Sequence, residues 1–172
     1  MKVQEIMSID LETCRPDDTL SRAAQIMWEH DCGVVPIVDG DAHVLGMLTD
    51  RDICMAAYTQ GRPLSEMLVS SACSGTPRAC RFDDSIENVE ALMSAARVRR
   101  IPVVDDEDKL CGIVSIGDLA RHVHEPTHRA DGLSYESIAS TVAAISLPAV
   151  EHRSNGAARR GANRMQSTTS RA

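Results

Sequence analysis

Two short segments of the chain place a hydroxyl and a carboxylate at the end of an apolar run. Residues 46–52 read GMLTDRD, and residues 112–118, 66 positions later, read GIVSIGD. Each predicts a buried strand that runs into a helix. Thr49 or Ser115 then lies at the strand end, and Asp52 or Asp118 lies in the first helical turn. Such groups can hydrogen-bond a polar ligand, and they can equally serve only to start a helix.

Nothing near these segments suggests catalysis. The sequence contains no G-x-S-x-G motif, no P-loop and no glycine pattern for a dinucleotide. No nucleophile stands beside a general base. We therefore expect a binding protein with no catalytic residues and no enzyme activity.

The elements that must position these groups follow from periodicity. Apolar residues at helical spacing predict a helix after a brief strand at 13–16. A β-branched run at 34–38, an Asp-Gly turn and a second run at 43–49 predict a hairpin, and a helix follows at 50–58. The buried face of the first helix is expected to contain Leu20, Ala23, Ala24, Met27 and Trp28.

The same order returns in the second half of the chain. From Cys80 onward the offset is a constant 66, which matches Cys14 to Cys80, Pro36 to Pro102 and Asp52 to Asp118. The opening segment 3–7 is matched to 64–68 at an offset of 61, so the loop 69–77 is expected to absorb five extra residues. The pattern indicates a duplicated β-α-β-β-α unit. One unit of roughly 60 residues buries too little surface to be stable alone, so we expect the two sheets to pack around an approximate two-fold axis.

The division of the chain follows from this repeat. We expect repeat 1 at 1–62, repeat 2 at 63–125, and a linker with one more helix at 126–147. Residues 148–172 contain five Arg and one Glu, and Val150 and Met165 are their only apolar residues larger than Ala apart from Pro148, which predicts a disordered basic tail. The fold class is therefore α+β, as mixed α/β repeats with an additional C-terminal helix.

Composition limits the function further. The 172-residue chain is 43% hydrophobic and only 2% aromatic, so its core and any ligand pocket must be mainly aliphatic. The formal net charge is −7 although the tail carries about +4, which makes nucleic acid an improbable partner.

The six cysteines include no C-x-x-C pair, and no apolar run approaches the roughly 18 residues of a membrane span. The start of the chain lacks the apolar core of a signal peptide. We expect a cytoplasmic protein without a membrane or metal role, in which the cysteines are small apolar side chains.

The duplicated unit resembles a tandem pair of CBS (cystathionine β-synthase) domains, a Bateman module, over residues 1 to about 125. The resemblance rests on the VVPIVD and RIPVVD strands, the two G-x-x-(T/S)-x-x-D segments and the constant repeat. It implies a regulatory, signal-transducing module similar to small stand-alone bacterial CBS proteins. It also implies adenosine nucleotides as ligands (AMP, ADP or ATP, or else NAD or S-adenosylmethionine), a homodimer and a client protein of unknown identity.

The family pattern implies two clefts, each built from both repeats. One takes its ribose contacts from Ser115 and Asp118 and a phosphate contact from Arg100. Its base contacts come from the first repeat, around Glu12, Cys32, Gly33 and Val34.

The other cleft takes its ribose contacts from Thr49 and Asp52. Its base contacts come from Arg78, Val98 and Arg99. Because the counterpart of Arg100 is Val34, this cleft lacks the phosphate cation unless Arg51 substitutes. The Ser115/Asp118 cleft is therefore expected to prefer a phosphorylated ligand.

Three alternatives stay open. The chain could be a ligand-independent interaction or stress-response protein that uses the extra helix from Tyr135 as its partner surface. His122, His124 and His128 could bind a metal, although a basic helix end is the simpler interpretation. The Arg97, Arg99 and Arg100 cluster could simply interact with the negative end of a helix.

Overall fold

The computed structural model describes residues 1–73, 75, 77–124 and 133–147. The predicted tail at 148–172 and residues 126–132 of the predicted linker lie outside this part of the chain. Among the described residues, no helix has the length and apolar character needed to cross a membrane.

The first repeat is built as the periodicity predicts. It contains α1 (Leu20–Glu29), β1 (Val34–Val38), β2 (Val44–Thr49) and α2 (Asp50–Gln60). β1 and β2 form an antiparallel hairpin in which Val34 pairs with Thr49. The short strand expected at 13–16 is a single parallel bridge between Cys14 and Ile37. Side-chain caps start the helices, as Thr19 shows by accepting a hydrogen bond from the Arg22 N–H at 3.2 Å.

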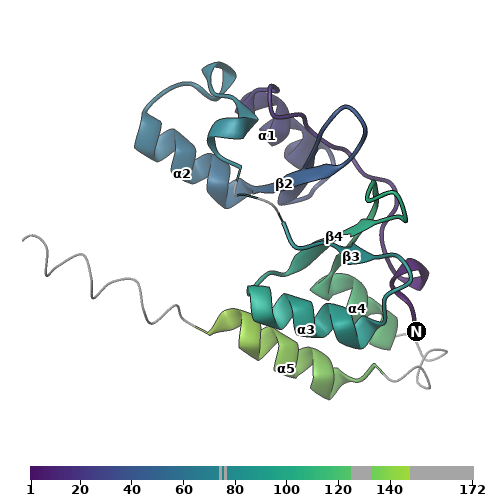
Figure 1. The fold of residues 1–172 in the computed structure, drawn as a ribbon. Coiled ribbons are helices and arrows are strands. Elements are labelled where there is room, and N and C mark those ends of the chain that lie inside the picture. The colour runs from purple at the N-terminus through teal and green to yellow at the C-terminus, as the bar shows by residue number, and fades with distance from the viewer. Residues whose placement is uncertain (74, 76, 125–132, 148–172) are drawn as a thin grey trace, which may run out of the picture.

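The second repeat has the same order with a longer sheet. It contains β3 (Cys80–Arg81), α3 (Ile86–Ala96), β4 (Arg100–Val104), β5 (Leu110–Ser115) and α4 (Ile116–His124). β3 runs parallel to β4, and β4 pairs antiparallel with β5. The additional helix α5 (Tyr135–Ser146) packs against α3 and α4, on the far side from the first repeat (Figure 1).

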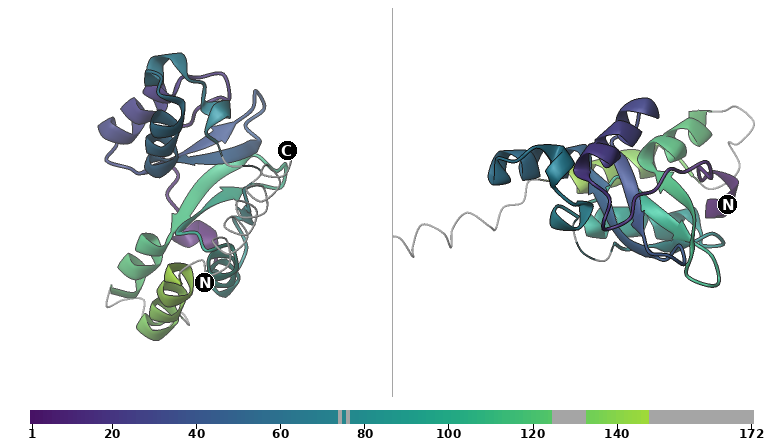
Figure 2. Two further views of the ribbon diagram at one scale, coloured as in Figure 1. Left: turned by 90° about the vertical axis from the view of Figure 1, so that its left-hand side faces the viewer. Right: turned by 90° about the horizontal axis from the view of Figure 1, so that it is seen from above.

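The two sheets face each other between outer helices (Figures 1 and 2). At the seam His43 forms an antiparallel bridge with Lys109, and the Leu110 N–H donates to the Ala42 carbonyl at 2.9 Å. His43 and Lys109 are equivalent residues, 66 positions apart. A residue that pairs with its own counterpart lies near a two-fold axis, so the mixed α+β fold has the expected pseudo-symmetry.

The leading segment of each repeat packs on the other repeat. The 3-10 turn η1 (Val3–Glu5) packs in the second core, where the Val3 N–H donates to the Asp84 carbonyl at 3.0 Å. The turns η2 (Leu64–Glu66) and η3 (Val69–Ser71) pack on the first repeat, where the Val69 N–H donates to the Asp18 carbonyl at 2.8 Å. These two bonds are equivalent at an offset of 66. The offset of 61 predicted for the opening segment is therefore wrong, and the loop absorbs no extra residues.

The buried face of α1 also differs from the prediction. Trp28 is 87% exposed, whereas Ile26 is 1% exposed. The apolar stripe is rotated toward Ile26 because α1 packs against β1 of the hairpin and against η2. The two cores are aliphatic, and each gathers around one hairpin.

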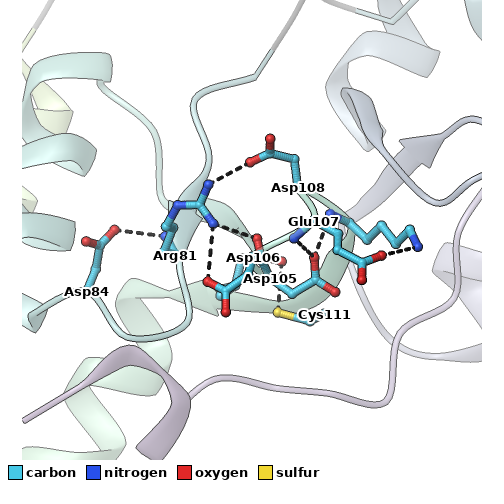
Figure 3. Close-up of polar contacts among 9 residues, drawn as sticks. Arg81, Asp84, Asp105, Asp106, Glu107, Asp108 and Cys111 are labelled. Atoms are coloured by element: carbon cyan, nitrogen blue, oxygen red, sulfur yellow. Dashed lines mark hydrogen bonds and ion pairs between the residues drawn. The ribbon is translucent and has the colours of Figure 1, made fainter.

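A polar network around Arg81 fixes β3 to the β4–β5 turn (Figure 3). Its guanidinium donates to the Asp105 carbonyl at 2.8 Å and to Asp108 at 3.0 Å, and it lies 3.6 Å from Asp106. The Arg81 N–H donates to Asp84 at 2.8 Å. The network holds the second repeat's edge strand in place although β3 has only two residues.

Candidate ligand-binding site

The two polar segments adopt the same local geometry. In the first, the Thr49 N–H and Oγ donate to Asp52 Oδ2 at 2.9 and 2.6 Å, and the Asp52 N–H donates back to Thr49 Oγ at 3.2 Å. In the second, the Ser115 N–H and Oγ donate to Asp118 Oδ2 at 2.7 and 2.6 Å, and the Asp118 N–H donates back at 3.2 Å. Each pair is a capping box that starts α2 or α4. One carboxylate oxygen of each Asp is thereby used within the protein.

The second carboxylate oxygen differs between the repeats. Asp118 Oδ1 accepts a hydrogen bond from the Arg121 guanidinium, and Asp118 is only 7% exposed. The residue equivalent to Arg121 is Met55, so Asp52 has no such partner. Within the described part of the chain, no hydrogen bond or ion pair engages Asp52 Oδ1. Asp52 therefore keeps an acceptor free for a ligand, and Asp118 does not.

A cavity of about 730 Å³ lies between the repeats beside the first of these pairs. The first repeat contributes Val34, Met47 and Thr49, and α5 contributes Ile145. The second repeat contributes Gly75, Pro77, Arg78, Ala96, Arg97, Val98, Arg99, Arg100 and Pro102. The cavity thus combines aliphatic walls with a row of guanidinium groups.

The cavity brings together most of one predicted residue set. Thr49, Arg78, Val98 and Arg99 line it together, and Asp52 is hydrogen-bonded to Thr49. Arg100 lines it too, although the sequence assigned Arg100 to the Ser115/Asp118 cleft.

The other predicted set is less concentrated. Val34 lines the Thr49 cavity, whereas Cys32 and Gly33 line a shallower pocket of about 590 Å³ beside Trp28 and Asp50. Glu12 lies 4.0 Å from the His30 ring. Ser115 and Asp118 are bound to each other and line neither of these two pockets.

Sequence reasoning did not assign several residues of the cavity wall. Arg97 was noted only as part of a cluster at a helix end, although its spacing from Arg99 on a turn could have placed it in the site. Met47 precedes Thr49 by two positions, so strand alternation predicts the same face for both. Ile145 of α5 carries no such signal because its place depends on how α5 packs.

One thiol lies close to the cavity. The Cys73 Sγ lies 3.9 Å from the Met47 carbonyl oxygen. Burial raises the pKa of Cys73, and the negative charge of Asp52 adds to the shift. The raised pKa favours the neutral thiol, which is a weaker nucleophile than the thiolate.

Potential metal ligands meet at the first hairpin turn. Asp39, Asp41 and His43 place their ligand atoms within 4.8 Å of one another. Asp39 also accepts hydrogen bonds from the Asp41 and His43 N–H groups, both at 2.9 Å, which explains the cluster as turn structure. Of the three histidines that could have formed a metal site, His128 lies outside the described residues.

The CBS domain model matches this chain at residues 3–58 and 69–125. The chain belongs to the CBS domain family. The matched ranges begin at Val3 and Val69, in agreement with the offset of 66 that the hydrogen bonds define.

Known relatives are similar over most of their length. The CBS domain-containing protein YhcV of Bacillus subtilis is 35% identical over 140 residues, which cover 79% of this chain and 94% of YhcV. Hypoxic response protein 1 of Mycobacterium tuberculosis is 34% identical over 71% of this chain and 85% of its own.

Solved structures are similar in fold over most of their length. A crystal structure of Hypoxic Response Protein I with two coordinated zinc ions superposes with a TM-score of 0.65 at 32% identity, covering 73% of this chain and all of that one. The CBS domain pair of protein MJ0100, in complex with 5′-methylthioadenosine and S-adenosyl-L-methionine, superposes with a TM-score of 0.63 at 26% identity, covering 70% and 98%.

Proposed function

We propose that this protein is a non-enzymatic regulatory module that binds an adenosine nucleotide between its two CBS repeats. The observation that carries the proposal is the cavity whose walls come from both repeats, with Thr49 on one side and Arg78, Val98 and Arg100 on the other. The adenosine ligands named for the MJ0100 pair support it.

The groups in the cavity suit each part of a nucleotide. Val34, Met47 and Val98 provide aliphatic surfaces for the base. The free oxygen of Asp52 accepts from a ribose hydroxyl in a charge-assisted hydrogen bond, which is stronger than a neutral one. We propose that the equivalent cleft, with Ser115 and Asp118 and with further contacts from Glu12, Cys32, Gly33 and Val34, binds a ribose only when the Arg121 guanidinium leaves Asp118 Oδ1.

A ligand in this cavity contacts both repeats, and each repeat has its own hydrophobic core. The described residues form one cluster around the first hairpin and another around the second. A ligand with higher affinity for one relative orientation of the repeats shifts the population toward it. We propose that this shift is the signal read by a client protein in the cytoplasm.

Isothermal titration calorimetry and thermal-shift measurements with AMP, ADP, ATP, NAD and S-adenosylmethionine test the proposal. A ligand that binds the folded state raises the apparent stability by mass action. Binding of at least one of them is expected, with a loss of affinity in Asp52→Ala. No binding by the intact protein at millimolar ligand contradicts the proposal.

We also propose a homodimer formed through α1 and α2. These helices pack against each other and carry three exposed apolar residues: Trp28, 87% exposed, Tyr58, 83% exposed, and Met55, 48% exposed. Exposed apolar residues gathered at one end of a protein are typical of an interaction surface. The same surface favours the second candidate function, a ligand-independent interaction protein, in which a different protein covers it.

Light scattering with wild type and Trp28→Glu distinguishes these cases. A dimer that Trp28→Glu converts to a monomer supports self-association. A wild-type monomer that binds no nucleotide supports the interaction protein. The single Trp also reports burial of this surface through its fluorescence.

A further inference from the structure

The two repeats place opposite charges at equivalent positions. Four pairs of equivalent positions lie near the clefts. In repeat 1 two of these positions are acidic and two are uncharged, whereas in repeat 2 all four are arginine. The pairs, each 66 residues apart, are Glu12 and Arg78, Asp31 and Arg97, Gly33 and Arg99, and Val34 and Arg100. The duplicated fold is symmetric, but its charge is not.

All four arginines line the Thr49 cavity. Each is exposed, and their guanidinium groups make no ion pair or side-chain hydrogen bond with any residue that the structure describes. Among the other described arginines, Arg62, Arg81 and Arg121 each pair with a nearby carboxylate. Arg15, Arg22 and Arg51 show no such side-chain pair with a described residue, but none of them lines the cavity, so it is the gathering of four unpaired arginines that distinguishes this site. The chain as a whole has a net charge of −7, yet four positive charges lie around this one cavity. Their mutual repulsion is relieved when an anion binds among them, so the cavity favours an anionic ligand.

A general helix-end effect does not account for the cluster. Arg97 follows α3 directly, where a cation interacts favourably with the negative end of the helix dipole. Arg78 precedes β3, however, and Arg100 is the first residue of β4. Arg97, Arg99 and Arg100 thus lie on the turn from α3 into β4, and Arg78 comes from the segment before β3, so the cavity brings together arginines from two separate segments.

We infer that this cavity selects a ligand with a polyphosphate chain, namely an adenosine nucleotide with two or more phosphates. The nucleoside part of this inference rests on the function proposed above, whereas the polyphosphate part rests on the arginines alone. Guanidinium groups bind phosphate oxygens with two parallel hydrogen bonds, so several of them around one cavity match a chain of phosphates. Thr49 lines the cavity from the first repeat and is hydrogen-bonded to Asp52, so a ribose held by this pair would leave the phosphates to the arginines of the second repeat.

Calorimetry with ATP, ADP, AMP and inorganic tripolyphosphate tests this inference on the intact chain. ATP is expected to bind at least about tenfold more tightly than AMP, and to weaken as salt is raised. Arg78→Gln and Arg100→Gln should each weaken ATP binding about tenfold while AMP binding changes less. Arg62→Gln is the matched control because Arg62 is an exposed arginine that pairs with Glu66 and does not line the cavity.

The outcomes separate the two proposals. Equal affinity for AMP and ATP, or ATP binding that is unchanged in both cavity variants, overturns polyphosphate selection and leaves the nucleotide module intact. Arginine-dependent binding of tripolyphosphate, with no binding of AMP, ADP, ATP, NAD or S-adenosylmethionine, supports the anion site and overturns the nucleotide module. No binding of any of the four probes overturns polyphosphate selection, and it overturns the nucleotide module as well if NAD and S-adenosylmethionine also fail to bind.

Discussion

Asp31 and Arg97 occupy equivalent positions in the two repeats and share a left-handed backbone conformation, with φ of 48° and 54°. Each follows the first long helix of its repeat, where a left-handed residue commonly ends the helix. Glycine is the usual residue there because a Cβ atom makes this conformation less favourable, by about 1 kcal/mol. Both repeats instead carry a charged residue, and the two charges are opposite.

Glycine substitutions at Asp31 and Arg97 can be compared directly, because the two residues share a backbone conformation and differ in charge. Arg97→Gly and Asp31→Gly should each stabilise the fold by up to about 1 kcal/mol in urea unfolding, because the left-handed strain is relieved. Arg97→Gly should also weaken ATP binding, because it removes a cavity cation, whereas Asp31→Gly should leave that affinity unchanged. If Arg97→Gly gains stability without losing ATP affinity, Arg97 acts only as a helix end.

The two aspartates of the capping boxes should respond differently to removal. Asp118→Ala is expected to lower the free energy of unfolding by about 1–2 kcal/mol, because Asp118 is buried and accepts bonds from Ser115 and Arg121. It should leave ATP binding at the Thr49 cavity unchanged. Asp52→Ala should cost about 1 kcal/mol of cap stability and also weaken ATP binding.

Urea unfolding and calorimetry on both aspartate variants provide the measurement. The reverse pattern, in which Asp118→Ala alone abolishes ATP binding, would place the phosphorylated ligand in the Ser115/Asp118 cleft. That result would restore the assignment of Arg100 made from sequence.

The sequence predicted the elements of this fold because their signals are local. The Asp-Gly turn, the β-branched strands and the capping boxes around Thr49 and Ser115 all depend on residues within a few positions of one another. The repeat at offset 66 then implied the pairing of the two halves, which the His43 to Lys109 bridge confirms.

Features that depend on long-range packing were predicted less well. Residues 64–68 resemble 3–7 in apolar pattern, but the hydrogen bonds from Val3 to Asp84 and from Val69 to Asp18 define the true register. Arg100 begins a strand between two clefts, and sequence alone does not say which cleft its side chain lines.

Two buried cysteines predict a loss of stability at alkaline pH. Burial, aided by the charge of Asp18 or Asp84, raises the pKa of Cys14 to about 11 and of Cys80 to about 12, from the ordinary value of 9.0. Well below pH 9 both thiols are neutral in the folded and unfolded states. Above it, the unfolded thiols ionise first, so each can remove up to about 1.4 kcal/mol per pH unit until its folded pKa is reached.

Urea unfolding at pH 8, 9 and 10 under reducing conditions measures this slope. A Cys14→Ala/Cys80→Ala variant should show a shallower slope, although its stability at pH 8 will be lower because two buried side chains are shortened. An unchanged slope would show that other groups cause the alkaline loss. In the wild type, a thiol reagent should label the exposed Cys54 well before Cys14 or Cys80.

The last prediction concerns α5, which has no counterpart in repeat 1. Ile138 is 8% exposed within the second core, and the buried Thr141 hydroxyl donates to Glu90 at 3.4 Å. Ile138→Ala should therefore lower the free energy of unfolding by about 2–4 kcal/mol, whereas Val142→Ala, at a 42% exposed position of the same helix, should cost less than about 0.5 kcal/mol.

Urea unfolding of both variants distinguishes a structural helix from a free partner surface. A large loss confined to Ile138→Ala means that the inward face of α5 is part of the core, so a partner can reach only its outer face. Because Ile145 of the same helix lines the ligand cavity, Ile138→Ala should then also weaken nucleotide binding. Equal and small effects of the two substitutions would mean that α5 detaches at little cost and is available to a partner, as in the alternative that the sequence left open, with the partner surface on the helix from Tyr135.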